Sequence, residues 1–163
     1  MRAPTLLKAA ILAAFVVVGV NGAAWANILI LIDKAAQRMS VRVDGVNRYN
    51  WPVSTGRAGY ATPSGTFTPF RMEAEHFSQE WDDAPMPYSI FFTRKGHAIH
   101  GSYHGGLGMP RSHGCVRISP GNAAILYSLV QAEGLGRTKV VLTGGGFGFG
   151  FRGNQWGTFG FRR

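Results

Sequence analysis

The chain has 163 residues, which is enough for one domain of ordinary size. Apolar residues make up 45% of it and charged residues 15%, which excludes wholesale disorder, and 23 glycines favour strands and turns over a helical bundle. The formal net charge of +9 suggests an anionic partner, such as nucleic acid, a membrane surface or an acidic polymer. A single cysteine excludes an intramolecular disulfide framework and a zinc ribbon built on cysteine pairs.

The first 26 residues have the three regions of a secretory signal peptide. Arg2 and Lys8 give a positive n-region, residues 9–20 are apolar, and Ala24-Trp25-Ala26 is an A-x-A cleavage site. This apolar run is shorter than the roughly 20 residues that cross a bilayer as a helix. We expect residues 1–26 to be cleaved during export, which places the protein in the periplasm or cell wall with a net charge of +7. There, cell-wall polymers and lipid headgroups are the expected anionic partners, and no nucleic acid is expected.

The mature part begins with the pattern of paired strands. Ile28–Asp33 is a short apolar run typical of a buried strand, and Arg38–Val43 alternates apolar and polar residues. Asp44-Gly45 suits the two-residue type I′ turn of a hairpin. The return strand would place Tyr49, Trp51 and Val53 on one face.

Further strands are predicted in the middle and at the end of the domain. Residues 54–65 are dense in Gly, Ser, Thr and Pro and indicate a loop. Thr66–Met72 and Ser89–Thr93 favour strands, separated by the acidic and aromatic stretch Glu73–Pro87. Thr138–Thr143 is a β-branched strand that closes the domain.

One helix has clear signals at both ends. Ser119 is a candidate N-cap, Pro120 suits the first helical position, and Gly134 lies just past the end. Its predicted apolar face consists of Ile125, Leu126, Leu129 and Val130. Residues 144–163, rich in Gly and aromatic residues, have no periodicity that would build a core, and we expect a flexible tail that is solvated or contacts the wall.

The chemistry-bearing residues cluster at 97–117, which hold four of the five histidines and the only cysteine. His100 and His104 are four residues apart, as in helical zinc motifs, but the intervening and following glycines oppose a helix and no Glu follows His100. We therefore expect no metal. A glycine-rich loop with incidental histidines is the least informative alternative, and the tight clustering disfavours it.

A cysteine nucleophile with a histidine base explains the cluster best. An imidazole next to a thiol of ordinary pKa near 8.5 can draw it toward the thiolate. Gly114 permits a tight turn before Cys115, and the N–H groups of these two residues would then converge on a developing oxyanion. An apolar strand before His100 would hold that histidine rigidly. The residues alone do not decide whether His100 or His113 is the base.

Several of these segments together resemble the L,D-transpeptidase catalytic domain family, whose members build or edit bacterial peptidoglycan. The segments are Ile99-His100-Gly101-Ser102, Leu107-Gly108, Ser112-His113-Gly114-Cys115-Val116-Arg117, Pro52 to Gly56, Thr62 to Phe67 and the helix from Asn122 to Ala132. The resemblance implies a mostly β fold, a β-sandwich with one helix following the catalytic Cys loop. It also implies a catalytic domain spanning residues 27–143.

The resemblance assigns roles residue by residue. Cys115 corresponds to the nucleophile, His100 to the proton donor and acceptor, and Ser102 to a residue that orients this base. Supporting or oxyanion-binding roles fall to Ser112, His113 and Gly114, and substrate-binding roles to Gly101 and Arg117. No cofactor is expected.

The implied reaction acts on peptidoglycan stem peptides. The Cys115 thiolate attacks the bond between the third residue and the terminal D-Ala of a tetrapeptide stem, releases D-Ala and forms a thioester, which an amine of a neighbouring stem resolves into a cross-link. Water as the acceptor would make an L,D-carboxypeptidase, and an amine of an envelope protein would make an anchoring enzyme. A catalytically inert wall-binding protein and a zinc-dependent wall hydrolase are the rival interpretations. Arg57, Arg111 and Arg117 are candidates for binding the carboxylates of the stem peptides. We expect the protein to be a monomer.

Overall fold

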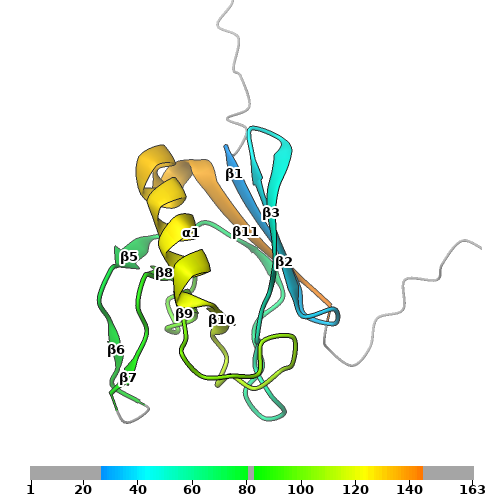
Figure 1. Ribbon diagram of the computed structural model, residues 1–163, viewed down its shortest axis with the longest axis vertical. Helices are drawn as coiled ribbons and strands as arrows, with labels where there is room; N and C mark the ends of the chain where they lie inside the picture. Colours follow the sequence, from blue (N-terminus) through cyan, green and yellow to red (C-terminus); the bar gives the residue numbers. More distant parts are fainter. Residues whose placement is uncertain (1–26, 81–82, 145–163) are drawn as a thin grey trace, which may run out of the picture.

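The computed structural model describes residues 27–80 and 83–144, which form two main β-sheets and a helix (Figure 1). The larger sheet has the order β3-β2-β1-β11-β4, with bounds Val46–Pro52, Arg38–Val43, Ile28–Asp33, Thr138–Thr143 and Gly65–Phe67. The smaller sheet has the order β10-β9-β8-β5, with bounds Val116–Ile118, Ala98–Gly101, Ser89–Phe91 and Arg71–Glu73. Strands β6 (Phe77–Ser78) and β7 (Ala84–Pro85) pair as a separate short hairpin.

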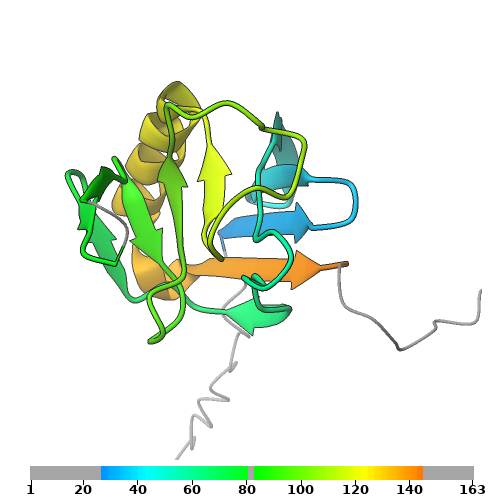
Figure 2. The same ribbon diagram turned by 90° about the horizontal axis from the view of Figure 1, so that it is seen from below.

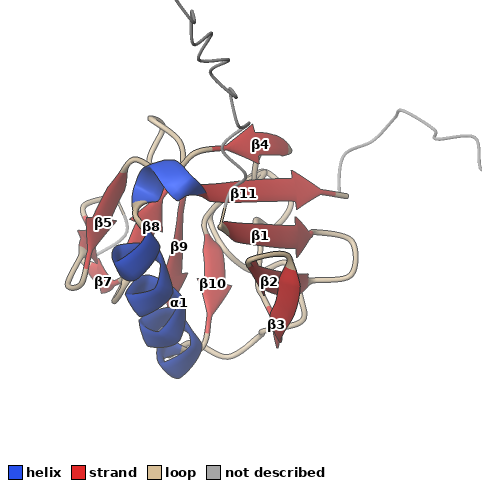
Figure 3. Ribbon diagram, turned by 90° about the horizontal axis from the view of Figure 1, so that it is seen from above, coloured by secondary structure: helices blue, strands red, loops and turns tan. Residues whose placement is uncertain are grey.

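The strands of the two sheets run across one another (Figures 2 and 3). Parallel pairing joins β1 to β11 and β9 to β10, whereas the other pairs are antiparallel. Helix α1 (Pro120–Glu133) packs against β9 and also contacts β8 and β1. A 3-10 turn, η1 (Leu135–Arg137), then leads into β11. No helix in the described part of the chain has both the length and the apolar character needed to cross a membrane.

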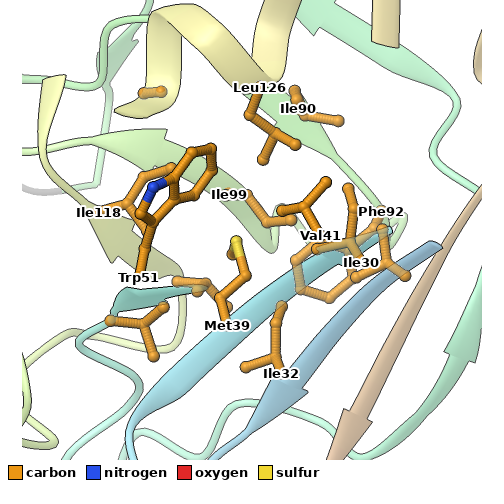
Figure 4. Close-up of a cluster of buried hydrophobic side chains, with 14 of the residues drawn as sticks. Ile30, Ile32, Met39, Val41, Trp51, Ile90, Phe92, Ile99, Ile118 and Leu126 are labelled. Atoms are coloured by element: carbon orange, nitrogen blue, oxygen red, sulfur yellow. The ribbon is translucent and has the colours of Figure 1, made fainter. Parts of the chain in front are cut away.

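The main core fills the space between the two sheets and the helix (Figure 4). The larger sheet contributes alternate residues, including Ile30, Ile32 and Val41, as the period of two requires. The smaller sheet contributes a second set that includes Ile90 and Ile99. Because β9 is buried on both sides by this packing, a residue placed on it is held rigidly.

Most of the predicted elements are present at the expected positions. Asp44 and Gly45 both have positive φ, 50° and 78°, as a type I′ turn between β2 and β3 requires. The Ser119 hydroxyl accepts from the Asn122 N–H at the helix start, and Gly134 ends the helix. The buried face of α1 differs in part from the prediction, because Ala123, Leu126 and Val130 are buried while Ile125 is 41% exposed.

One prediction in the middle of the chain was wrong. Thr66–Met72 is not one strand, since β4 pairs with β11 in the larger sheet and β5 pairs with β8 in the smaller one. The chain crosses between the sheets at Thr68–Phe70, where Pro69 lacks the N–H that a continuous ladder needs. The stretch Glu73–Pro87, for which no strand was predicted, contains the β6–β7 hairpin.

The predicted fold class is confirmed at the level of architecture. The described residues form a mostly β fold with packed sheets, and α1 begins shortly after the loop that carries Cys115. The expected signal peptide at 1–26 lies outside the described residues, and so does the predicted tail after Gly144.

Candidate active site

His100 occupies a buried position on β9, the strand between β8 and β10. Its side chain is enclosed so well that the residue is 5% exposed. The ring Nδ1 lies 2.8 Å from the carbonyl oxygen of Gly101. A carbonyl only accepts hydrogen bonds, so Nδ1 carries the proton and the neutral ring presents Nε2 as its acceptor.

The surroundings of His100 keep its imidazole neutral. Burial lowers its pKa to about 4, and the charges of Arg117 and His76 act in the same direction. The hydrogen bond to the Gly101 carbonyl opposes this shift without cancelling it. At neutral pH the ring is therefore a base with a free Nε2, and once protonated it is a strong proton donor.

Cys115 lies in the turn that precedes β10 and is half-buried. Its Sγ is 3.8 Å from the carbonyl oxygen of Gly96. Burial raises the pKa of the thiol, and Glu80 adds to this, while the Ala98 backbone and Arg117 oppose it. Thiol and imidazole are thus both neutral at rest. The thiolate–imidazolium pair considered from the sequence does not fit these two pKa shifts.

The loop before Cys115 is held by a network of short hydrogen bonds. The Ser112 hydroxyl donates to the Cys115 carbonyl at 2.5 Å and accepts from the Gly114 N–H at 3.1 Å. Thr62 lies on the other side, where its Oγ1 donates to the Gly114 carbonyl and accepts from the Gly56 N–H, both at 2.8 Å. Ser112 and Thr62 are buried, so both residues fix the turn that presents the thiol.

This network bears on the predicted oxyanion role of Gly114. In the structure, which holds no substrate, the Gly114 N–H donates to the Ser112 hydroxyl. By contrast, the structure gives no acceptor for the Cys115 N–H within residues 27–80 and 83–144. Glycine is nevertheless required at 114, because its φ is +113° and a Cβ there would lie 3.3 Å from the His97 ring.

Ser102 and Gly101 directly follow His100 in the chain, and both are buried. The Ser102 hydroxyl accepts from the His104 N–H at 3.2 Å, which ties down the start of the glycine-rich loop. The group that orients the His100 ring is the Gly101 carbonyl. Gly101 itself packs closely on Pro120 and Pro87, where a Cβ would come within 3.0 and 3.1 Å. These contacts favour a base-orienting role for Gly101 over direct substrate contact.

His113 and Arg117 lie two residues on either side of Cys115. The His113 ring meets the edge of Tyr60 at a centroid distance of 4.8 Å. Burial and the charges of Arg57 and Arg117 lower the pKa of His113. Arg117 pairs with His100 in the β10–β9 register and is half-buried, which brings a guanidinium next to both candidate catalytic groups.

Cys115 and His100 line one cavity of about 380 Å³. Ser102, His113 and Arg117 line it too, so the structure brings together most of the residues that the sequence singled out. Another part of the cavity lining had not been anticipated. It comes from the 73–87 segment and includes His76, Glu80 and Met86. His76 is the one histidine outside the 97–117 cluster, and its Nδ1 bonds the Glu73 carboxylate at 2.5 Å.

Other residues near the site were also missed by the sequence analysis. Thr62 and Gln37 are buried polar residues, and both brace the 54–62 loop against its neighbours. Thr62 begins a segment that carries the family resemblance but was given no role, and Gln37, in a turn, had no signal of its own. Among the described residues, no group of three or more His, Cys, Asp or Glu is arranged to hold a metal ion.

Comparison with known proteins adds an independent line of evidence. The profile of the YkuD family, described as the L,D-transpeptidase catalytic domain, matches residues 27–142. No curated protein sequence matches the chain.

Solved L,D-transpeptidases share this fold. One from Mycobacterium smegmatis is 26% identical with a TM-score of 0.65, covering 72% of this chain and 59% of its own. One from Stackebrandtia nassauensis is 28% identical with a TM-score of 0.64, covering 72% and 56%. One from Xylanimonas cellulosilytica is 26% identical with a TM-score of 0.63, covering 73% and 61%. The chain thus spans less than two thirds of each of these solved chains. The extent of the profile match shows that the chain belongs to the L,D-transpeptidase catalytic domain family.

Proposed function

We propose that this protein is a peptidoglycan L,D-transpeptidase that works through a Cys115 thioester. The observation that carries the proposal is the state of His100 in the cavity it shares with Cys115. Its Nδ1–H is fixed on the Gly101 carbonyl and its pKa is lowered to about 4, so Nε2 is free to accept a proton. A fixed neutral base beside the chain's only thiol suits acyl transfer by general base catalysis.

In the first half-reaction, His100 Nε2 takes the Sγ proton as Cys115 attacks the carbonyl of the third stem residue. The tetrahedral oxyanion is stabilised by the Cys115 N–H, with the nearby Arg117 guanidinium as a source of positive charge. The C–N bond to D-Ala then breaks, and protonated His100 gives its proton to the departing amine. Because the pKa of His100 is about 4, this proton is released readily.

In the second half-reaction, a side-chain amine of a neighbouring stem attacks the thioester carbon. His100 accepts the amine proton, the C–S bond breaks, and His100 returns this proton to the Cys115 sulfur as the cross-link forms. Water in place of the amine would give a tripeptide, and an amine of an envelope protein would give an anchored protein. Cys115 and His100 have the same roles with each of these acceptors.

We also propose that the reaction takes place outside the cytoplasmic membrane. The support is the signal-peptide pattern of residues 1–26 and the positive charge of the remaining chain, which suits a wall polymer bearing carboxylates. No partner is proposed besides the stem peptides and, in the anchoring alternative, an envelope protein.

The test is mass spectrometry of the purified protein after incubation with a disaccharide-tetrapeptide. A cross-linked dimer with free D-Ala is the expected product. A tripeptide alone would indicate a carboxypeptidase, and an unchanged substrate would indicate an inert wall-binding protein. Cys115→Ala is the matched control, since it removes the nucleophile and little volume. Activity that persists in this variant would contradict the thioester mechanism, and activity lost to EDTA and restored by zinc would support a metal-dependent hydrolase.

A further inference from the structure

A second cavity, of about 620 Å³, lies beside the catalytic cavity. The two share His104, His113 and Arg117 as walls, but Cys115 and His100 line only the first. The remaining lining of the second cavity comes from Arg57, Gly105, Met109, Pro110 and Arg111. The second cavity is therefore adjacent to the reacting atoms without containing them.

The charge of this second cavity is uncompensated. Three arginines line it, Arg57, Arg111 and Arg117, and no Asp or Glu of the described residues does. The ion pairs within residues 27–80 and 83–144 both involve Glu73, so none of them neutralises these arginines. Burial and the charge of Arg57 lower the pKa of Arg117, which means that the two cations repel each other. An anion in this cavity would relieve that repulsion.

Both outer arginines are held in place by contacts of their own. The Arg57 N–H donates to the Ser112 carbonyl at 3.0 Å, and its guanidinium lies 4.9 Å from the Tyr60 ring centroid. The Arg111 N–H donates to the Ser54 hydroxyl at 3.1 Å. The Arg111 side chain lies across Gly106, where a Cβ would come within 2.6 Å of its Cδ. Their positions on one loop framework reduce the entropy that binding an anion would cost.

We propose that this second cavity is a carboxylate-binding subsite for a peptide stem, an inference that rests on the proposed function. A planar guanidinium binds a carboxylate through two parallel hydrogen bonds. Three arginines line this cavity. A stem whose carboxylate binds Arg57 and Arg111 would run past His113 and Arg117 to reach Cys115. Donor and acceptor stems both carry free carboxylates, and the experiment has an arm for each.

Calorimetric binding to the Cys115→Ala protein tests the subsite without turnover. The acceptor probe is a tripeptide stem, which has no D-Ala to release, and the donor probe is a tetrapeptide stem with its side-chain amine acetylated. Each is compared with its carboxylate-amidated form. We expect amidation to weaken binding of one of them by about tenfold or more, which is the range of a charge-assisted hydrogen bond. Whichever probe responds identifies the stem that the subsite holds.

The variants assign the effect to the cavity. Replacing both Arg57 and Arg111 by Gln in the Cys115→Ala protein should remove the difference between free and amidated peptide. The matched control replaces Arg42 and Arg48, exposed arginines of the larger sheet, and should keep the difference. An equal affinity for free and amidated peptides, or a difference that survives in the Arg57→Gln, Arg111→Gln protein, would overturn the subsite. So would an equal loss in the control.

The binding readout separates this inference from the proposed function. If the wild-type protein makes no product while its Cys115→Ala form discriminates between free and amidated peptides, the transpeptidase proposal fails and the subsite stands. If the wild-type protein makes cross-links while no discrimination is found, only the subsite is overturned.

Discussion

The neutral state of His100 has a consequence for stability that is independent of any substrate. In the fold the pKa of His100 is about 4, whereas an unfolded chain has a histidine pKa of about 6.5. Between these values the unfolded chain binds more protons than the folded one. The free energy of unfolding therefore decreases as the pH falls below about 6.5, and the decrease is complete near pH 4.

The size of this effect follows from the two pKa values. Their difference of about 2.5 corresponds to about 3 kcal/mol, of which about 2 kcal/mol is lost between pH 7.5 and pH 5. His100 is 5% exposed, so solvent screening reduces this value little. Urea unfolding at pH 7.5 and pH 5 measures it, with wild type, His100→Gln and His113→Gln compared.

The His100→Gln protein should lose about 2 kcal/mol less than wild type between the two pH values, because it has no buried imidazole to protonate. His113→Gln should lie much closer to wild type than to His100→Gln, because the pKa of His113 is also lowered but this residue is less buried than His100. If wild type and His100→Gln show the same pH dependence, the imidazole is not held neutral by the fold, and the reasoning about its resting state is wrong.

Three further predictions concern the thiol and its loop. The rate of Cys115 alkylation by iodoacetamide should rise only above about pH 8.5, because burial raises the pKa of the thiol. A rise near pH 6 would instead indicate an ion pair between the Cys115 thiolate and a histidine. Gly114→Ala should destabilise the protein by about 1–2 kcal/mol or more, because the φ of Gly114 is +113° and the added Cβ would crowd the His97 ring. The control Gly121→Ala adds a methyl group in open space on α1 and should not lower the melting temperature. Thr62→Val should lower the free energy of unfolding by about 2 kcal/mol and slow acylation, because it leaves the Gly56 N–H and the Gly114 carbonyl unpaired. Urea unfolding measures the loss, and an equal loss in the control Thr66→Val, at an exposed threonine, would contradict this prediction.

Local signals in the sequence predicted the elements that depend on neighbouring residues. Asp44-Gly45 defines its hairpin through backbone conformations available to those two residues, and Ser119, Pro120 and Gly134 define the helix through its caps. The strand predicted at Thr66–Met72 failed because alternation does not say which sheet a residue joins. The hairpin inside Glu73–Pro87 was missed because its strands are two residues long.

In the candidate site, too, features set by neighbouring residues were predicted and features set by the fold were not. The motif around Cys115 and the strand before His100 are contiguous in sequence, so both residues were found together. The hydrogen bond from the Gly114 N–H to Ser112 depends on the path of the turn. The lowered pKa of His100 depends on its burial between β8, β10 and the 73–87 segment. Neither is encoded in local spacing. Arg57 and Arg111 were named from the sequence as suited to carboxylates, but their meeting in one second cavity depends on the fold, since they lie far apart in the chain.

In the proposed mechanism His100, and not His113, transfers the proton for Cys115. Single-turnover acylation by a donor tetrapeptide, followed by intact-protein mass spectrometry, measures it directly in wild type, His100→Gln and His113→Gln. His100→Gln should lower the acylation rate by about 10²–10⁴-fold, the usual contribution of a general base, and His113→Gln should lower it much less. A larger loss in His113→Gln, with His100→Gln close to wild type, would contradict the assignment and make His113 the base.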